Sequence, residues 1–421
     1  MALFTFRRWQ AAVGTAFVSA TLLAACGGGG SSGATADLAA STVTPADTSS
    51  VADTYSQGPI SGFGSIVVGG VRYEDSLAAV SDEDGVSHNR SALKLGMTVQ
   101  VDAGVVTRAV VGSAAAATAW ASRIRFGSEI VGPVGAVNSA AGTLQVLGQA
   151  VTVTSATVFD DTLVGGLAAL NTGAVVEVHG LRDTVTGATV ATRIEPKAGA
   201  TRYRLRGTVA ALNSTAKTFS IGSAAVSYAS LTPAPTGLAN GQTVRLLLQT
   251  TASNGAWVAT TLNNGLRLPE GTVREAHIEG LITAYTASTA FTVNGLLVDA
   301  SSATFPDGTS AVVLGARVEV TGSVSNGKLV ATRVEIEERR DAGKRSLELH
   351  GAITSIDTTA KTFVLRGITV WYGGMVTYSN GAESGLVVGK TVEVRGVLAA
   401  DRMRLEARSI ELKGTTGSTT G

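Results

Sequence analysis

The chain has 421 residues and a nearly balanced charge, with 33 lysines and arginines against 32 aspartates and glutamates. Proteins that bind nucleic acid generally carry a strong basic excess or a basic stripe, so we expect no nucleic-acid partner. Fifty-one glycines, only eight prolines and abundant valine, alanine and threonine are typical of many short β-strands joined by turns.

The first 25 residues have the features of an export signal. Arg7 and Arg8 supply its positive start, and Ala11 to Leu23 is an apolar segment too short to span a bilayer as a mature helix. Leu23-Ala24-Ala25-Cys26 follows the pattern of a bacterial lipobox and resembles the processing site of lipoproteins. Cys26 is the only cysteine and cannot form an internal disulfide. We expect lipidation at Cys26; the alternative is an ordinary signal peptide with a chance cysteine.

Residues 26–57 are expected to form the lipid anchor and a disordered tether. They are rich in small and polar residues and cannot bury enough apolar surface to fold. A flexible segment of this kind reaches about 30 Å. Gly27 follows the cysteine where an aspartate would favour the inner membrane, so analogy with lipoproteins favours the outer membrane. We expect a lipid-anchored protein of the cell envelope, with periplasmic and surface-facing placements both open.

One β unit recurs about every 72 residues through the rest of the chain. Its signature is a glycine followed by a small or apolar residue and then valine or isoleucine. We place it at Gly135-Ala136-Val137, Gly207-Thr208-Val209, Gly280-Leu281-Ile282 and Gly351-Ala352-Ile353, with a shorter relative at Gly62-Phe63-Gly64. The recurrence predicts about five copies of one small β domain.

The fourth copy shows the expected strands most clearly. Asn294-Gly295 is a strong hairpin signal between two apolar segments, and Val318 to Gly322 alternates apolar and polar residues with period two. The predicted strands cover residues 277–284, 291–293, 296–298, 318–322 and 329–336. The alternating strand recurs in the other copies, for example as Val176 to Gly180 and Val392 to Gly396.

The last strand of the unit contains a slip in its alternation. Leu329 and Ala331 share one face, but the next large apolar residues are Val334 and Ile336. One extra residue restores the inward face, as a β-bulge does. We therefore predict bulges near Thr332-Arg333 and, from the same pattern, near Arg408-Ser409.

These patterns predict an all-β protein, a tandem array of about five small OB-like antiparallel β-barrels after a signal peptide and a tether. Each unit is too small to bury a large core, so we expect adjacent repeats to lean on each other. The expected segments are 1–25 for the signal peptide, 26–57 for the anchor and tether, 58–130, 131–199, 200–273, 274–343 and 344–414 for repeats 1 to 5, and 415–421 for a disordered tail.

The lipobox, the tether and these repeats together resemble the proteobacterial lipoproteins with repeated DUF 5666 domains. The resemblance is carried by the opening Gly62 to Val71 and by repeat ends of the form Ala-Thr-Arg-Ile/Val-Glu, and it covers about Gly58 to Lys413. It implies an OB-like β fold and a place in the cell envelope. It brings no catalytic residues to this chain.

Two motifs suggest chemistry that their context does not favour. Gly385 to Thr391 resembles a phosphate-binding loop, but its first glycine would have to be Ser384, and a strand rather than a helix follows it. Similar glycines precede the alternating strands elsewhere, which indicates a recurrent turn. Asp82-Glu83-Asp84-Gly85 could contribute to a Ca²⁺ site, but the remaining ligand pattern is absent and an acidic turn is the better interpretation.

The chain offers no catalytic or metal-binding constellation in its sequence. The four histidines show no local ligand pair, and His179 is expected on the outward face of its strand. No nucleophile elbow is present, and the single cysteine is assigned to lipidation. We therefore expect no enzymatic activity, no cofactor and no metal.

Two clusters are candidate ligand-binding sites. Arg202, Arg204 and Arg206 alternate along one strand and share a face that could meet an anionic glycan, lipid head group or polymer; the alternative is a face paired with nearby acids. Trp371 and Tyr372 could stack on a sugar, although aromatic residues favour strands in any case.

The sequence is therefore compatible with two functions. The first is a non-enzymatic envelope lipoprotein whose β modules act as scaffold, adaptor or spacer, with an envelope protein or glycan as possible partner. The second is a binding module for an oligosaccharide or another anionic polymer on the faces of the barrels. The oligomeric state stays open.

Overall fold

The computed structural model describes residues 52–108, 117–269, 271–337, 346–399 and 404–413. It is an all-β structure, as predicted: strands dominate, with three 3-10 turns at Arg90–Ala92, Gly166–Ala169 and Glu383–Gly385. Within these ranges no helix has the length and apolar character needed to cross a membrane. Cys26, most of the expected tether and the expected tail at 415–421 lie outside the described residues.

Repeat 2 shows the strand order of one barrel. It consists of β8 (Ile130–Asn138), β9 (Thr143–Val146), β10 (Gln149–Phe159), β11 (Val175–Arg182) and β12 (Thr189–Pro196). β8 pairs with β9, β9 with β10, β10 with β12, β12 with β11, and β11 with β8 again, so the sheet closes on itself. The β10–β12 pair is parallel and the others are antiparallel. The order first-second-third-fifth-fourth-first is that of a small OB-like barrel.

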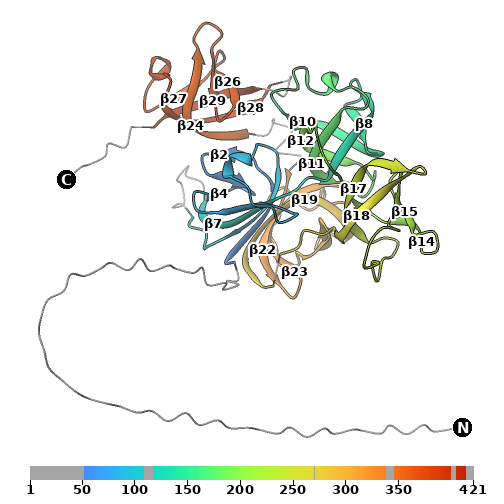
Figure 1. The fold of residues 1–421 in the computed structure, drawn as a ribbon. Helices are drawn as coiled ribbons and strands as arrows, with labels where there is room; N and C mark the ends of the chain where they lie inside the picture. The colour runs from blue at the N-terminus through green and yellow to red at the C-terminus, as the bar shows by residue number, and fades with distance from the viewer. Residues whose placement is uncertain (1–51, 109–116, 270, 338–345, 400–403, 414–421) are drawn as a thin grey trace, which may run out of the picture. The chain divides into compact units, whose positions relative to one another are not determined.

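The same strand order occurs in the other four repeats. Figure 1 labels strands of all five repeats. Repeat 1 contains β1 (Thr54–Pro59), β2 (Gly62–Phe63), β3 (Ile66–Val68), β4 (Val71–Glu74), β5 (Ala79–Asp82), β6 (Thr98–Ala103) and β7 (Ala117–Phe126). Repeat 3 contains β13 (Tyr203–Thr208), β14 (Ala210–Asn213), β15 (Thr218–Ile221), β16 (Ala224–Ser227), β17 (Thr243–Ser253) and β18 (Ala256–Asn264). Repeat 4 contains β19 (Val273–Ala287), β20 (Ala290–Val293), β21 (Leu296–Asp299), β22 (Arg317–Ser325) and β23 (Lys328–Ile336). Repeat 5 contains β24 (Ser346–Asp357), β25 (Thr362–Leu365), β26 (Ile368–Trp371), β27 (Thr377–Ser379), β28 (Thr391–Leu398) and β29 (Arg404–Leu412).

The structure corrects the glycine register of the first two repeats. In repeats 3 to 5 the signature glycine lies opposite the first valine of the alternating strand, for example Gly280 opposite Val318. The residues in that position in repeats 1 and 2 are Gly58 and Gly132, not Gly62 and Gly135. The repeat therefore recurs every 71 to 75 residues, from Gly58 through Gly132, Gly207, Gly280 and Gly351.

This register also explains why the expected tether was too long. Each first strand begins before its glycine, so repeat 1 begins at Thr54, where β1 starts. β1 is buried along its whole length, because it pairs with β6 of its own barrel and with β19 of repeat 4. Residues 54–57 are therefore part of a barrel and not part of a tether.

The glycine turn before the fourth strand is confirmed in every repeat. Gly389, from the segment that resembles a phosphate-binding loop, has φ +85° and donates its N–H to the Ile353 carbonyl at 2.8 Å. Ile353 in turn donates to the Lys390 carbonyl. The equivalent glycines are Gly96, Gly173, Gly241 and Gly315, all with positive φ and an N–H bond to a carbonyl in the first strand or directly after it. The left-handed conformation explains the glycine, and the segment is a structural turn.

The bulges predicted in the last strand are confirmed, and they occur in all five repeats. Thr321 faces Arg333 while the next residue, Gly322, faces Ala331, so Thr332 is the extra residue. The other extra residues are Ser122, Thr192, Thr260 and Arg408. In repeats 1, 3 and 4 the hydroxyl of the extra residue donates to a carbonyl of the fourth strand, as Thr332 does to Thr321 at 3.1 Å. The hydroxyl therefore satisfies a carbonyl beside the irregular ladder.

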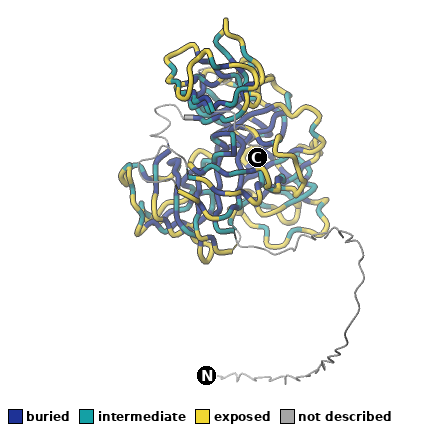
Figure 2. Tube along the Cα trace, turned by 90° about the vertical axis from the view of Figure 1, so that its left-hand side faces the viewer, coloured by how far each residue is buried: buried dark blue, intermediate teal, exposed yellow. Residues whose placement is uncertain are grey.

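The repeats are joined by strand pairs, but mostly not between neighbours in sequence. β1 pairs in parallel with β19 of repeat 4, and β2 pairs with β24 of repeat 5. Among the strands of the described residues, only the β8–β13 pair joins consecutive repeats, 2 and 3. The buried side chains form three clusters: one mainly in repeats 1 and 5, which Val158 of repeat 2 joins, one in repeats 2 and 3, and one in repeat 4, which Tyr55 of repeat 1 joins. Figure 2 shows the buried segments along the strands and the exposed ones at many of the turns. Pairing outer strands in this way also covers edges that would otherwise be open.

Candidate functional site

The acidic turn of repeat 1 is confirmed as a turn, and it presents two carboxylates to repeat 3. Asp82 at the end of β5 accepts the backbone N–H groups of Asp84 and Val86 at 2.9 and 3.0 Å, so its carboxylate holds the turn together. The side chains of Glu83 and Asp84 leave the turn and meet arginines of repeat 3. These carboxylates have cationic partners from the protein itself, which accounts for the acidic sequence without Ca²⁺.

Glu83 forms the centre of a buried ion-pair cluster. Its side chain is 8% exposed, and it accepts hydrogen bonds from Arg267, at 2.5 Å from Nε, and from Arg206. Arg267 also donates to Glu129 at 2.6 Å, and Arg206 Nε lies 3.4 Å from the same carboxylate. We call Glu83, Glu129, Arg206 and Arg267 the junction cluster. Its two acids and two bases come from repeats 1 to 3.

The pKa of Glu83 shows which effect dominates in the junction cluster. Burial by itself raises the pKa of a carboxyl group, because the charged form loses its hydration. The adjacent Arg267 and Arg206 overcome this and hold the pKa of Glu83 at about 2. The pKa of Arg267 is correspondingly raised, since Glu83 and Glu129 outweigh its own burial. Glu83 and Arg267 are therefore both charged at neutral pH.

Asp84 makes a second set of contacts beside the junction cluster. Its carboxylate bonds to Arg204 and Arg245, and Arg245 also donates to the backbone carbonyl of Glu83 at 2.9 Å. Arg204 donates further to the Ser128 hydroxyl at 3.1 Å. Both arginines belong to repeat 3, so the acidic turn is held from two neighbouring strands.

The three arginines predicted as an anion-binding face do not act as one surface. Arg204 and Arg206 are engaged by Asp84 and Glu83, and Arg206 is only 5% exposed. Arg202 is exposed just before β13. The structure therefore supports the alternative of a face paired with acids for Arg204 and Arg206. The partner acids lie about 120 residues away in sequence, which is why sequence reasoning listed the two features separately.

The aromatic pair of repeat 5 is split between the core and the surface. Tyr372 is 3% exposed and packs on Phe363, with ring centroids 5.7 Å apart. Trp371 is partly buried at the end of β26, with the Arg404 guanidinium 5.9 Å from its ring centroid. Tyr372 therefore contributes to the core, and Trp371 already has a cationic neighbour. They do not form a shared stacking platform.

His179 points out of its own barrel, as predicted, but repeat 1 covers it completely. Its Nδ1 lies 3.1 Å from the Gly127 carbonyl and therefore carries the proton, while Nε2 has no hydrogen-bond partner. Burial lowers the pKa of His179, against the opposing effect of the Glu177 carboxylate. The neutral imidazole is thus the form that fits between repeats 1 and 2.

We expect this histidine to make the contact sensitive to acid. The unfolded chain takes up a proton near the ordinary histidine pKa of 6.5, whereas the folded chain resists it. The stability that neutral His179 gives to the folded chain is therefore complete above pH 6.5. It is lost as the pH falls toward the lower pKa of the folded chain. Denaturant unfolding between pH 8 and 5 should show the free energy of unfolding falling more steeply for the wild type than for His179→Gln. Equal slopes would contradict this assignment.

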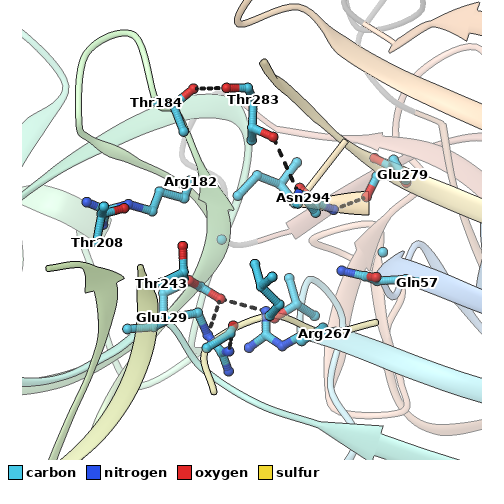
Figure 3. A pocket seen from close by; sticks show the side chains of 18 of the residues that line it. Gln57, Glu129, Arg182, Thr184, Thr208, Thr243, Arg267, Glu279, Thr283 and Asn294 are labelled. Carbon is cyan, nitrogen blue, oxygen red and sulfur yellow. Dashed lines mark hydrogen bonds and ion pairs between the residues drawn. The ribbon is translucent and has the colours of Figure 1, made fainter. Parts of the chain in front are cut away.

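A cavity of about 120 Å³ lies where repeats 1 to 4 meet. Its lining includes Glu129, Arg206 and Arg267 of the junction cluster, together with Arg182 from the end of β11 (Figure 3). Threonines from all four repeats and Asn294 complete much of its polar lining. Sequence reasoning did not identify Arg182 or this cavity; the available signal was that an arginine occurs where the other repeats have no charge.

Comparison with known proteins finds a family for three of the five repeats. Residues 131–195, 279–335 and 350–411 each match the model described as "Domain of unknown function (DUF5666)". No curated protein matches the chain. A solved structure named Drosophila Unr CSD456 aligns with 51% of this chain and 98% of its own length at 14% identity, with a TM-score of 0.13, too low to carry an argument. Repeats 1 and 3 lie outside the matches but share the strand order of the matched ones.

Proposed function

The chain carries repeated DUF5666 domains, and from that premise we propose that it is a non-enzymatic lipoprotein of the cell envelope. In this proposal its barrels act together as one scaffold or adaptor. The proposal for the anchor depends on the lipobox, Leu23-Ala24-Ala25-Cys26, and on the export signal before it. The proposal for the scaffold depends on how the repeats are joined.

The junction cluster is the observation that carries the scaffold. If the repeats were independent domains, the charged side chains of each repeat would be exposed to water. Exposed ion pairs contribute little to stability. Here Glu83 of repeat 1 is buried against two arginines from repeat 3 and its neighbouring segment. The charges of these side chains match only when repeats 1 and 3 meet in this one arrangement, and removing one partner within the folded chain would leave a buried charge unpaired. This supports a rigid adaptor over a flexible spacer.

The barrel interiors are consistent with a structural role. Inward residues such as Val101, Leu246 and Val320 are fully buried in their barrels. A small barrel filled by its own side chains leaves its outer surface for contacts with other molecules. Binding of an anionic polymer through Arg202, Arg204 and Arg206 is less well supported, because two of these three arginines already have acidic partners.

The anchor is tested by metabolic labelling with a radioactive or clickable fatty acid. We expect the wild-type chain to be labelled and to fractionate with the outer membrane, because Cys26 would carry the lipid. Cys26→Ser should lose both the label and the membrane association. An unlabelled wild-type chain, or equal labelling of the two, would contradict the lipoprotein assignment. Turnover of a cell-wall substrate by the purified protein would contradict the non-enzymatic role.

A further inference from the structure

Arg182 is a cation without a counter-ion in the cavity between the repeats. It is the last residue of β11, and its guanidinium extends over the backbone of repeat 3, where a Cβ built on Gly207 would lie 3.2 Å from Nη1. Figure 3 shows it beside Thr208, away from the acids that the picture labels. Among the residues that the structure describes, none accepts a hydrogen bond from Arg182 or forms an ion pair with it.

The other charged residues that line this cavity are already matched. Glu129 is bonded to Arg267 and lies beside Arg206, and both arginines also bind Glu83. Glu279 binds Arg317, with Nε 3.1 Å from its carboxylate. The positive and negative charges of these groups cancel, so Arg182 remains as an additional positive charge in the cavity lining. Burial lowers the pKa of Arg182, and the Glu129 carboxylate only partly offsets this.

The fold itself does not require an arginine at this place. The fourth strands align through their bulges, so the residues equivalent to Arg182 can be identified in each barrel. They are Val105, Thr250, Val324 and Leu398. Val324 and Leu398 are buried and apolar. A half-buried guanidinium without a protein partner loses part of its hydration and gains no ion pair, so its presence in repeat 2 alone points to a role outside folding.

Two hydroxyl groups line the same cavity and are free to donate. Thr208 at the end of β13 lies directly opposite Thr243 at the start of β17. Neither hydroxyl has a hydrogen-bond partner among the described residues, whereas the Thr184 hydroxyl is used by the Thr283 carbonyl at 2.9 Å. A guanidinium and two hydroxyl donors along one wall are the groups that recognise an oxyanion.

We propose that this cavity is a binding site for a small oxyanion, a carboxylate or a phosphate group, held by Arg182 with Thr208 and Thr243. The guanidinium binds the two oxygens of such a group side by side. A cavity of about 120 Å³ has room for more than one water, and so for a small anionic group. The site does not depend on the scaffold role or on the lipid anchor.

The test is titration calorimetry on the purified chain with sodium acetate and with inorganic phosphate, at constant ionic strength. We expect the wild type to bind at least one of the two probes, and which one binds separates the carboxylate from the phosphate. Arg182→Met, which copies the apolar character of repeats 4 and 5, should weaken binding about tenfold or more. Arg202→Met is the matched control, since it removes the same charge from an exposed position and should bind as the wild type does.

Several results would overturn the site. They are absence of binding by the wild type, unchanged binding by Arg182→Met, or equal loss in Arg182→Met and Arg202→Met. Circular dichroism should show that Arg182→Met folds, since it removes a cation without a partner. If it does not fold, Thr208→Val provides the test: weakened binding supports the site, and unchanged binding overturns it.

Discussion

Replacing Glu83 with glutamine should lower the free energy of unfolding by about 3–5 kcal/mol, the range measured when one partner of a buried ion pair is removed. The variant leaves Arg206 and Arg267 buried with Glu129 as their single remaining carboxylate. Denaturant unfolding followed by fluorescence, in a background where the other tryptophans are replaced by phenylalanine, measures the loss at Trp257, which packs edge-on against Tyr203 in repeat 3. A loss reported from repeat 3 after a change in repeat 1 would show that the two repeats are coupled.

The matched control for this prediction is Glu383→Gln. Glu383 also pairs with a base, Lys361, but both side chains are more than 40% exposed. Exposed pairs contribute little, so the same chemical change there should leave the unfolding midpoint nearly unchanged. Equal effects of the two substitutions would contradict a special role for the junction cluster.

The effect of Glu83→Gln should also depend on pH in a defined direction. The pKa of Glu83 is about 2 in the folded chain, against an ordinary value of 4.5. A lowered carboxyl pKa contributes stability above 4.5 and loses it as the pH falls toward 2. The difference between wild type and variant should therefore be constant near neutrality and shrink below pH 4.5. A difference that grows on acidification would contradict the ion pairing.

The second large effect is expected from Gly322→Ala in the bulge of repeat 4. A Cβ at this position would overlap the carbonyl oxygen of Val330 and lie 2.8 Å from the Cα of Ala331. Both contacts are with backbone, which cannot move without disturbing the β22–β23 ladder. We expect a loss of about 1–3 kcal/mol, typical of overpacking. Thermal unfolding of the wild type and of Gly322→Ala measures this loss of stability.

Gly104→Ala is the control for this substitution. Gly104 directly follows the fourth strand of repeat 1, β6, and a Cβ there would meet no atom within 4 Å. Alanine also restricts the unfolded chain, so this variant should be as stable as the wild type or slightly more stable. If both alanine variants lose the same stability, close approach at the bulge is not the reason for Gly322.

The bulge was predictable from sequence because it leaves a local trace. The change of phase between Ala331 and Val334 occurs within one strand, and period-two alternation reveals it directly. The glycine register was not recovered in repeat 2, because Gly132-Pro133-Val134 and Gly135-Ala136-Val137 both fit the signature. The pairing of Gly132 with Val176 in the structure shows which of the two glycines occupies the signature position.

The junction cluster could not be predicted in the same way. Glu83 and Arg206 are separated by 123 residues, and no periodicity connects an acidic turn in one barrel with a strand in another. Sequence composition suggested that acids would balance the arginines, but not which acids. Arg182 is an intermediate case, because aligning the five fourth strands shows an arginine where every other repeat has an uncharged residue, buried in repeats 4 and 5.

The most direct test of the joined barrels is a double-mutant cycle between Glu83→Gln in repeat 1 and Arg267→Met beside repeat 3. Unfolding free energies of the wild type, the two single variants and the double variant give the coupling energy. Direct contact predicts a coupling well above the ~0.5 kcal/mol within which independent sites add. Additive losses would mean that the two side chains do not meet, and the account of one joined scaffold would be wrong.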